Sequence, residues 1–192
     1  MRRGGPAGEV GAVCVFCGSS PGTDPGITSA AARVGAGLAE RGIGLVYGGA
    51  SVGLMGVVAD AAIGAGGRAT GVITEALAGH EIAHAGLSEL RVVATMHERK
   101  AVMAELSDAF VMLPGGFGTY EEFMESVTWA QLGLHHKRCA VLNVGGFFDH
   151  LLRFVEHAVD SGFVKRHQAD ALVVSVDVDD LLDRIVGVTS RS

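Results

Sequence analysis

The chain has 192 residues, 48% of them hydrophobic and 19% charged, so it can bury a sizeable core in one domain. Its formal net charge of −6 argues against a nucleic-acid polymer as partner, because phosphate backbones are bound by an excess of lysine and arginine. No apolar run reaches the length of a membrane-spanning helix, so no membrane partner is expected. A single nucleotide, in contrast, needs only a local cationic site.

Residues 1–10 are glycine-rich and lack the apolar stretch of a signal peptide, which predicts a flexible tail before one domain over residues 11–187. Three cysteines without a secretion signal predict reduced thiols in a cytoplasmic protein. They are Cys14, Cys17 and Cys139. Cys14 and Cys17 match Cys-x-x-Cys, but on a strand their side chains would point to opposite faces, which favours buried structural thiols.

Apolar runs rich in valine, leucine and isoleucine alternate with segments of helical periodicity. Strands are expected at Ala12–Phe16, Gly44–Tyr47, Ala69–Ile73, Leu90–Val93, Ala109–Leu113, Ala140–Leu142 and Leu172–Val174. Helices are expected at Ser29–Glu40, Leu54–Ala65, His97–Leu106, Tyr120–Leu132, Phe148–Ser161 and Val178–Ile185. This order predicts an α/β fold, a single domain with a Rossmann-like, doubly wound parallel sheet covered by helices on both faces.

Three glycine-rich turns follow predicted strands, at Cys17–Ser20, Gly48–Gly53 and Pro114–Thr119. Ligands of open parallel sheets bind outside the carboxyl ends of the strands, so the three turns are expected to converge on one cleft. The second and third turns lead from a strand into a helix, where backbone N–H groups can bind an anion.

The third turn, which reads Pro-Gly-Gly-Phe-Gly-Thr-Tyr-Glu-Glu, has the features of a phosphate site. Its glycines permit close approach of the backbone to an anion. They are Gly115, Gly116 and Gly118. Thr119 is expected to cap the next helix, with Glu121 and Glu122 in the first turn beside the anion. From the turn alone, an ordinary strand-to-helix turn with two dipole-complementing glutamates is an equal alternative.

A second segment, Thr95–Met103, lies just before the strand that leads into the third turn. Its apolar residues have helical spacing, and it carries two adjacent cations, Arg99 and Lys100. Taken alone, these cations predict a solvated helix face.

The sequence also contains a rival nucleophile, because residues 49–53 match the Gly-x-Ser-x-Gly elbow between a strand and a helix. Ser51 would then attack the substrate as in a serine hydrolase. Its candidate bases are His135, His136, His150 and His157, and its candidate acids are Asp108 and Asp149. The absence of a glycine run for an oxyanion hole counts against this alternative. His80 and His84 have the spacing of zinc ligands on a helix, but no third ligand matches.

Four motifs stand in a fixed order over about Gly11 to Asp180. They are Phe16-Cys17-Gly18-Ser19-Ser20, the loop Gly48 to Gly56 that ends Gly-Leu-Met-Gly, Met96-His97-x-Arg99-Lys100, and Pro114-Gly115-Gly116-x-Gly118-Thr119-x-x-Glu122. Together they resemble the LOG ("Lonely guy") family, and the combination is far more specific than any one motif. The chain departs from the family at Ala50, where a third glycine is common, and in lacking a proline-rich approach to Glu81.

Members of this family are cytokinin riboside 5'-monophosphate phosphoribohydrolases, long mislabelled lysine decarboxylases. The resemblance implies hydrolysis of the N-glycosidic bond of an N6-modified adenosine 5'-monophosphate, without metal or other cofactor. It implies that Arg99 and Glu122 are catalytic, with Glu122 stabilising an oxocarbenium-like transition state. The substrate-binding residues that it implies are Glu81, Lys100, Gly115, Gly116, Gly118, Thr119, Glu121, Thr128, Gly48 and Gly49.

A molybdenum-cofactor carrier remains an alternative, because some proteins with a similar sheet and turn bind that cofactor. The set of Arg99, Lys100 and Glu122 favours a hydrolase, since a carrier has no need of a hydrolytic carboxylate. Lysine decarboxylation lacks the residue set that a pyridoxal enzyme requires.

The predicted helix Tyr120–Leu132 carries more apolar residues than one core-facing stripe holds. They are Phe123, Met124, Val127, Trp129, Ala130 and Leu132. The family resemblance implies a homodimer, in which this helix and His97–Leu106 would pack across a two-fold axis. The alternative is that the extra apolar residues lie under Phe147–Ser161 of the same chain.

Overall fold

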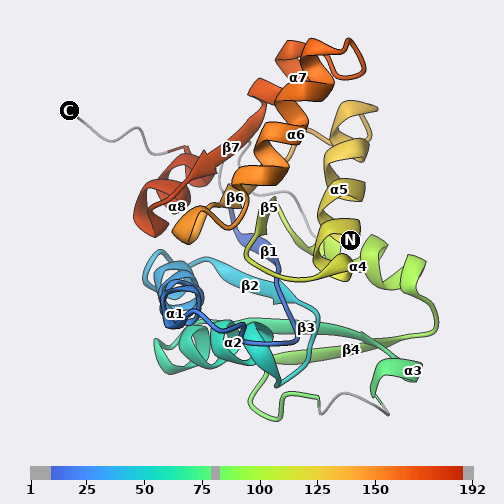
Figure 1. Ribbon diagram of the computed structural model, residues 1–192. Coiled ribbons are helices and arrows are strands. Elements are labelled where there is room, and N and C mark those ends of the chain that lie inside the picture. Colours follow the sequence, from blue (N-terminus) through green and yellow to red (C-terminus); the bar gives the residue numbers. More distant parts are fainter. Residues whose placement is uncertain (1–9, 79–82, 188–192) are drawn as a thin grey trace.

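The computed structural model describes residues 10–78 and 83–187. The predicted tail over residues 1–10, apart from its last residue, lies outside the described part of the chain, as do His80 and Glu81. Within the described part, seven strands form one sheet in the order β4-β3-β2-β1-β5-β6-β7, and all neighbouring strands are parallel. The predicted α/β fold, a Rossmann-like parallel sheet in a single domain, is confirmed (Figure 1).

The strands are β1 (Ala12–Phe16), β2 (Gly44–Tyr47), β3 (Ala69–Thr74), β4 (Glu89–Val93), β5 (Ala109–Met112), β6 (Arg138–Leu142) and β7 (Leu172–Ser175). The helices are α1 (Pro25–Glu40), α2 (Gly53–Gly64), α3 (Glu75–Ala78), α4 (Met96–Leu106), α5 (Phe117–Gln131), the 3-10 turn η1 (Val144–Gly146), α6 (Asp149–Asp160), α7 (Arg166–Asp170) and α8 (Val178–Val186). Each predicted strand is present within two residues of its expected ends.

Two corrections to the helix predictions concern the start of α1 and the short elements. Helix α1 begins at Pro25 rather than Ser29, because the Asp24 side chain accepts the N–H of Gly26 at 2.8 Å and Pro25 suits the first helical position. Three short elements, α3, η1 and α7, were not predicted, since three to five residues are too few to show a period.

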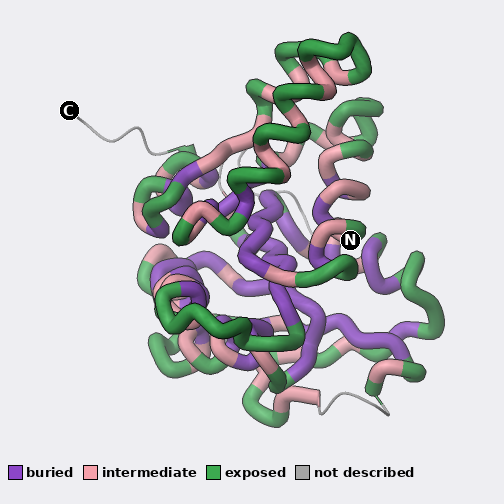
Figure 2. The backbone as a smooth tube through the Cα atoms, viewed as in Figure 1, coloured by how far each residue is buried: buried purple, intermediate pink, exposed green. Residues whose placement is uncertain are grey.

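Two layers of helices cover the sheet. The α1, α2 and α8 helices pack on one face, and α4 and α5 pack on the other, where α6 adds two leucines (Figure 1). Strand β1 is buried throughout (Figure 2). Its alternate side chains belong to the two core clusters on opposite faces of the sheet. Cys14 and Cys17 lie on opposite faces, as predicted, and these two cysteines and Cys139 are free and buried.

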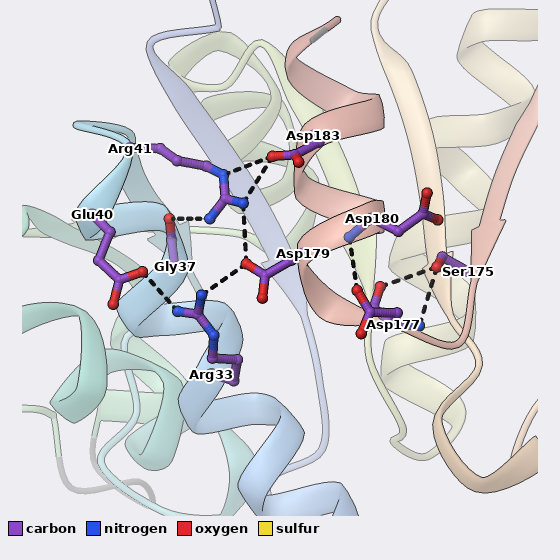
Figure 3. Close-up of polar contacts among 9 residues, drawn as sticks. All are labelled: Arg33, Gly37, Glu40, Arg41, Ser175, Asp177, Asp179, Asp180 and Asp183. Carbon is purple, nitrogen blue, oxygen red and sulfur yellow. Dashed lines mark hydrogen bonds and ion pairs between the residues drawn. The ribbon is translucent and has the colours of Figure 1, made fainter. Parts of the chain in front are cut away.

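Ion pairs join the last helix to the first (Figure 3). Arg41 contacts Asp179 at 3.0 Å and Asp183 at 2.8 Å, while Arg33 bridges Asp179 and Glu40. These side chains are partly exposed, so each pair adds little stability on its own. The network fixes α8 beside α1 and lies apart from the glycine-rich turns.

The order of the strands reverses at β1, whose neighbours are β2 and β5. Such a switch point opens a crevice at the carboxyl ends of the two central strands. Gly18 joins the three glycine-rich turns there, since its N–H donates to Pro114 O at 3.0 Å and its carbonyl accepts the N–H of Leu54 at 3.0 Å. The predicted convergence of these turns is confirmed. In residues 10–78 and 83–187 no helix has the length and apolarity needed to cross a bilayer.

Candidate functional site

The amino end of α5 follows directly after β5. Gly116 is the N-cap residue, and no side chain bonds to the first N–H groups of the helix. The expectation that Thr119 caps this helix is wrong, because the helix already begins at Phe117. Glu121 and Glu122 therefore lie in the second turn rather than the first. The uncapped N–H groups leave this end of α5 suited to an anion.

One glycine of the turn is closely packed, and the other two have open space beside them. A Cβ at Gly115 would lie 2.1 Å from Oγ1 of Thr119, so the buried threonine needs a glycine opposite it. A Cβ at Gly116 or Gly118 would meet nothing within 4 Å. Packing of the described residues does not require glycine at these two positions, so their open space is available to a ligand.

Gly118→Ala tests whether a ligand occupies this space. We expect an unchanged or higher melting temperature, because alanine is favoured over glycine in a helix by up to about 1 kcal/mol. We also expect the KM for a nucleoside 5'-monophosphate to rise at least about tenfold, since the methyl group would enter the open space in which the sequence predicts a phosphate. Gly64→Ala on α2, also without neighbours within 4 Å, is the matched control. An unchanged KM in Gly118→Ala would place the phosphate elsewhere.

Arg99 on α4 and Glu122 on α5 form a buried ion pair. Nη1 of Arg99 donates to Oε1 of Glu122 at 2.5 Å, and the two side chains are only 7% and 12% exposed. The solvated-face interpretation of Arg99 and Lys100 is wrong, because α4 packs against β1, β2 and β3 and buries both residues. A buried charge pair whose carboxyl has a shifted pKa is a candidate for chemistry.

The environment of Glu122 moves its pKa in opposing directions. Burial raises the pKa of this carboxyl above its usual value, and the charge of Glu121 adds to the rise. Arg99 and Lys100 oppose it. The nearby thiols of Cys14 and Cys17 are themselves held neutral, since burial and the charge of Glu122 raise their pKa. They are therefore poor nucleophiles.

The backbone around the pair holds Arg99 in place. Its Nε donates to Val72 O on β3 at 2.8 Å. Gly48 lies against the guanidinium, since a Cβ there would sit 2.4 Å from Nη2 of Arg99 and 2.8 Å from Sδ of Met55. Only glycine at position 48 leaves room for this arginine conformation.

Lys100 contacts two carboxylates of α5, Glu121 and Glu125, the latter at 3.1 Å. Burial opposes its charge, but these bonds raise the pKa of Lys100 above its usual value. Glu121 is more than half exposed, so its carboxylate stays accessible from solvent. The ion pairs between α4 and α5 thus hold the carboxylates of Glu121 and Glu122 in the second turn after the uncapped amino end of α5.

The remaining predicted binding residues are spread more widely. Gly49 is buried, with a φ of +82° that favours glycine, and lies beside Gly71. Thr128 is exposed, donates to Met124 O, and lies about 13 Å along α5 from Thr119 at 1.5 Å per residue. The structure does not bring Thr128 to the turn, and Glu81 lies outside the described residues.

The structure places several of the partners proposed for Ser51 at the opposite edge of the sheet. Ser51 follows β2 at the carboxyl edge of the sheet, whereas His135 and His136 precede β6 and Asp108 precedes β5 at the amino edge. Asp149 accepts from Asn143 at 2.8 Å. No group of three or more His, Cys, Asp or Glu side chains in the described ranges could hold a metal ion. His84 therefore belongs to no such group.

The sequence profile of the family described as "Possible lysine decarboxylase" matches residues 55–185. The chain belongs to this family. The probable cytokinin riboside 5'-monophosphate phosphoribohydrolase LOGL5 of Oryza sativa subsp. japonica is 50% identical over 173 residues, which cover 90% of this chain and 70% of that protein. The cytokinin riboside 5'-monophosphate phosphoribohydrolase LOG7 of Arabidopsis thaliana is 46% identical over 173 residues, with 90% and 80% covered.

Solved structures share the fold of this chain. The molybdenum cofactor binding protein of Rippkaea orientalis superposes with a TM-score of 0.69 at 19% identity, covering 92% of this chain and 96% of that one. The molybdenum cofactor carrier protein of Chlamydomonas reinhardtii superposes with a TM-score of 0.67 at 20% identity, covering 94% of this chain and 98% of that one. At this identity the likeness shows the fold alone.

Sequence reasoning missed some of the groups that shape the site. The carbonyl of Val72 lies 27 residues from Arg99, and a backbone acceptor leaves no signal in residue types. Glu125 could have been found, because it lies one helical turn after Glu121 on the same face of α5. Ala50 takes the place of a third glycine, which is common in the family, without a positive φ and with its side chain in the core.

Proposed function

We propose that the protein hydrolyses the N-glycosidic bond of an adenosine 5'-monophosphate, with or without an N6 substituent, to the free base and ribose 5-phosphate. The observation that carries the proposal is the buried Arg99–Glu122 pair beside the uncapped amino end of α5. Relatives at 44–50% identity over 90% of the chain are named for this reaction. The family label of lysine decarboxylase has less support, because Lys100 is engaged by two carboxylates.

The reaction breaks the bond between C1' of the ribose and the base nitrogen, and water supplies a hydroxyl to C1' and a proton to the base. Positive charge develops on the sugar, where the carboxylate of Glu122 stabilises it and orients the attacking water. Arg99 keeps Glu122 ionised and oriented. The N–H groups at Gly116 and Gly118 and the hydroxyl of Thr119 bind the 5'-phosphate.

Further contacts to the substrate are proposed from the family motifs. Glu121 would accept hydrogen bonds from the ribose hydroxyls, and Lys100 would hold Glu121 in place. Gly48 and Gly49 would line the cleft beside Arg99, and Glu81 would contact the base. No resident cofactor is needed for this hydrolysis.

The decisive experiment compares nucleotide with nucleoside. Purified protein, with no added metal, should release base from AMP or its N6-isopentenyl derivative, measured by chromatography. Adenosine should react at least about a hundredfold more slowly, because the turn at residues 115–119 then has no phosphate to bind. Equal turnover of both compounds would contradict the phosphate site. Tight binding of molybdenum cofactor without base release from any nucleotide would instead favour a carrier.

We also propose that the chain forms a homodimer through α4 and α5. Phe123 is fully buried within the chain, whereas Leu132 is 67% exposed, so the chain's own core covers only part of the apolar surface of α5. Phe117 at the start of α5 and Met96 at the start of α4 are 92% and 41% exposed. A second copy would cover these residues and bring its Thr128 toward the neighbouring cleft.

Light scattering at micromolar concentration tests the assembly, with a dimer mass as the expected result. Leu132→Lys should shift the mass toward monomer, because it places a charge in the proposed contact. Phe163→Lys is the control, since Phe163 is 88% exposed on the turn after α6. A monomer with full hydrolase activity would overturn the dimer.

A further inference from the structure

His84 connects the turn after residue 82 to the glycine loop and to α2. Its backbone N–H donates to Gly49 O at 3.1 Å, beside an isolated bridge between Ala50 and Ala83. Its ring contacts Asp60 Oδ1 through Nε2 at 2.9 Å and accepts the N–H of Gly86 through Nδ1 at 3.1 Å. The side chain of His84 is 10% exposed, whereas that of Asp60 is 74% exposed. The imidazole is therefore packed within the protein rather than lying on its surface.

These bonds define the form of the ring. Because Nδ1 accepts from Gly86, Nε2 carries the proton and donates to Asp60. The imidazole is thereby fixed between α2 and the turn at Gly86, and the backbone of His84 is bonded to Gly49. The two hydrogen bonds of the ring are part of neither the sheet nor the hydrophobic core.

The loop that His84 holds is the one that lies against the catalytic arginine. Gly49 has a φ of +82°, and a Cβ at the neighbouring Gly48 would sit 2.4 Å from Nη2 of Arg99. The loop backbone lies in close contact with the guanidinium, since even a methyl group at position 48 would overlap it. Movement of the loop would therefore change the space around Arg99 and its bond to Glu122.

We propose that His84, held by Asp60, is a positioning residue that seats the Gly48–Ala50 loop against Arg99 and thereby fixes the Arg99–Glu122 pair. This inference rests on the proposed hydrolase function for its kinetic readout. The contact with Arg99 is made by the loop, so His84 acts without touching the substrate. The zinc-ligand role considered for His84 is replaced by this one, because the described residues place both ring nitrogens in bonds to the protein.

The first readout is independent of activity. Hydrogen exchange of the backbone amides at residues 48–50 should become at least about tenfold faster in His84→Ala than in the unchanged protein, because the side-chain anchor is lost. Asp60→Ala should act in the same direction. Arg41→Ala, which loses the ion pairs between α1 and α8, is the control for a general loss of stability and should leave the exchange at this loop unchanged.

The second readout is the pH profile of kcat/KM. A loosened Arg99 opposes the raised pKa of Glu122 less, so the acid limb should move to higher pH in His84→Ala, with a loss of about tenfold in kcat. A lower folded fraction alone would reduce kcat without moving the limb. The charged and titratable groups that act on Glu122 are Arg99, Lys100, Glu121, Cys14 and Cys17. None of them is altered by the substitution.

Conservative and double variants complete the test. His84→Gln, whose amide can still donate to Asp60, and Asp60→Asn, whose oxygen can still accept, should recover most of the activity and the original limb. The double variant His84→Ala/Asp60→Ala should be no worse than either single variant, because both remove one interaction.

The inference would be overturned if His84→Ala left both the hydrogen exchange at residues 48–50 and the acid limb of kcat/KM unchanged. Additive losses of activity in the double variant would also overturn it. If the protein without any substitution shows no hydrolase activity, the proposed function is overturned instead. The hydrogen-exchange experiment would still decide the role of His84.

Discussion

Glu122→Gln is expected to lose at least about two orders of magnitude in kcat, which corresponds to about 2.7 kcal/mol of transition-state stabilisation. The amide has nearly the shape of the carboxylate and can still accept from Arg99, but it carries no charge to stabilise the developing oxocarbenium ion. Single-turnover release of base from AMP, followed by chromatography, measures the chemical step. Nucleotide affinity, measured by calorimetry, should change less than about threefold.

Two control variants separate this effect from general damage. Glu125→Gln removes a carboxylate from the same helix that contacts Lys100 rather than Arg99, and we expect most of the activity to remain. Ser51→Ala should also be mild. If Ser51→Ala were inactive and Glu122→Gln active, the serine-hydrolase alternative would replace the present proposal.

The parallel sheet could be predicted because its information is local and repeated. Strand β1 is apolar at every position and buried at every position, which is the pattern of a strand covered on both faces. The glycine-rich turns follow the strands, so their convergence at the carboxyl edge follows from parallel topology alone. Gly18 adds the contacts that sequence could not supply, since its two bonds reach residues 36 and 96 positions away.

The environment of the cations could not be predicted in the same way. Adjacent arginine and lysine on a short helix are solvated in most proteins, and nothing in the segment around Arg99 indicates burial. Burial arises from three distant partners, the carbonyl of Val72, the carboxylate of Glu122 and the backbone of Gly48. Only the family motifs, which stand together in one order, pointed to the pair.

The position of Thr119 illustrates a second limit. A threonine before two glutamates has the composition of a helix cap, and the helix nevertheless starts two residues earlier at Phe117. The hydroxyl of Thr119 packs against Gly115 instead. Glycine at the N-cap leaves the first N–H groups without a side-chain acceptor, a property that suits a ligand better than a capped helix would.

Arg99→Ala is expected to reduce kcat/KM by at least about a hundredfold and to move its acid limb to higher pH. Glu122 must be ionised to act, so activity falls as the pH falls through the pKa of this carboxyl, which burial already raises above its usual value. Arg99 is the main group that opposes the rise, and its removal therefore raises the pKa further. The measurement is kcat/KM for AMP between pH 4 and 9.

Arg99→Lys distinguishes the charge of the arginine from its geometry. Lysine keeps a positive charge near Glu122 but cannot both donate to Val72 O and reach the carboxylate in the planar arrangement of a guanidinium. The acid limb should stay closer to that of the unchanged protein than in Arg99→Ala, while kcat remains low. A limb that stays in place in Arg99→Ala would show that Arg99 does not control the ionisation of Glu122. It would then have to act on the departing base or the phosphate, and the ion pair would no longer carry the mechanism.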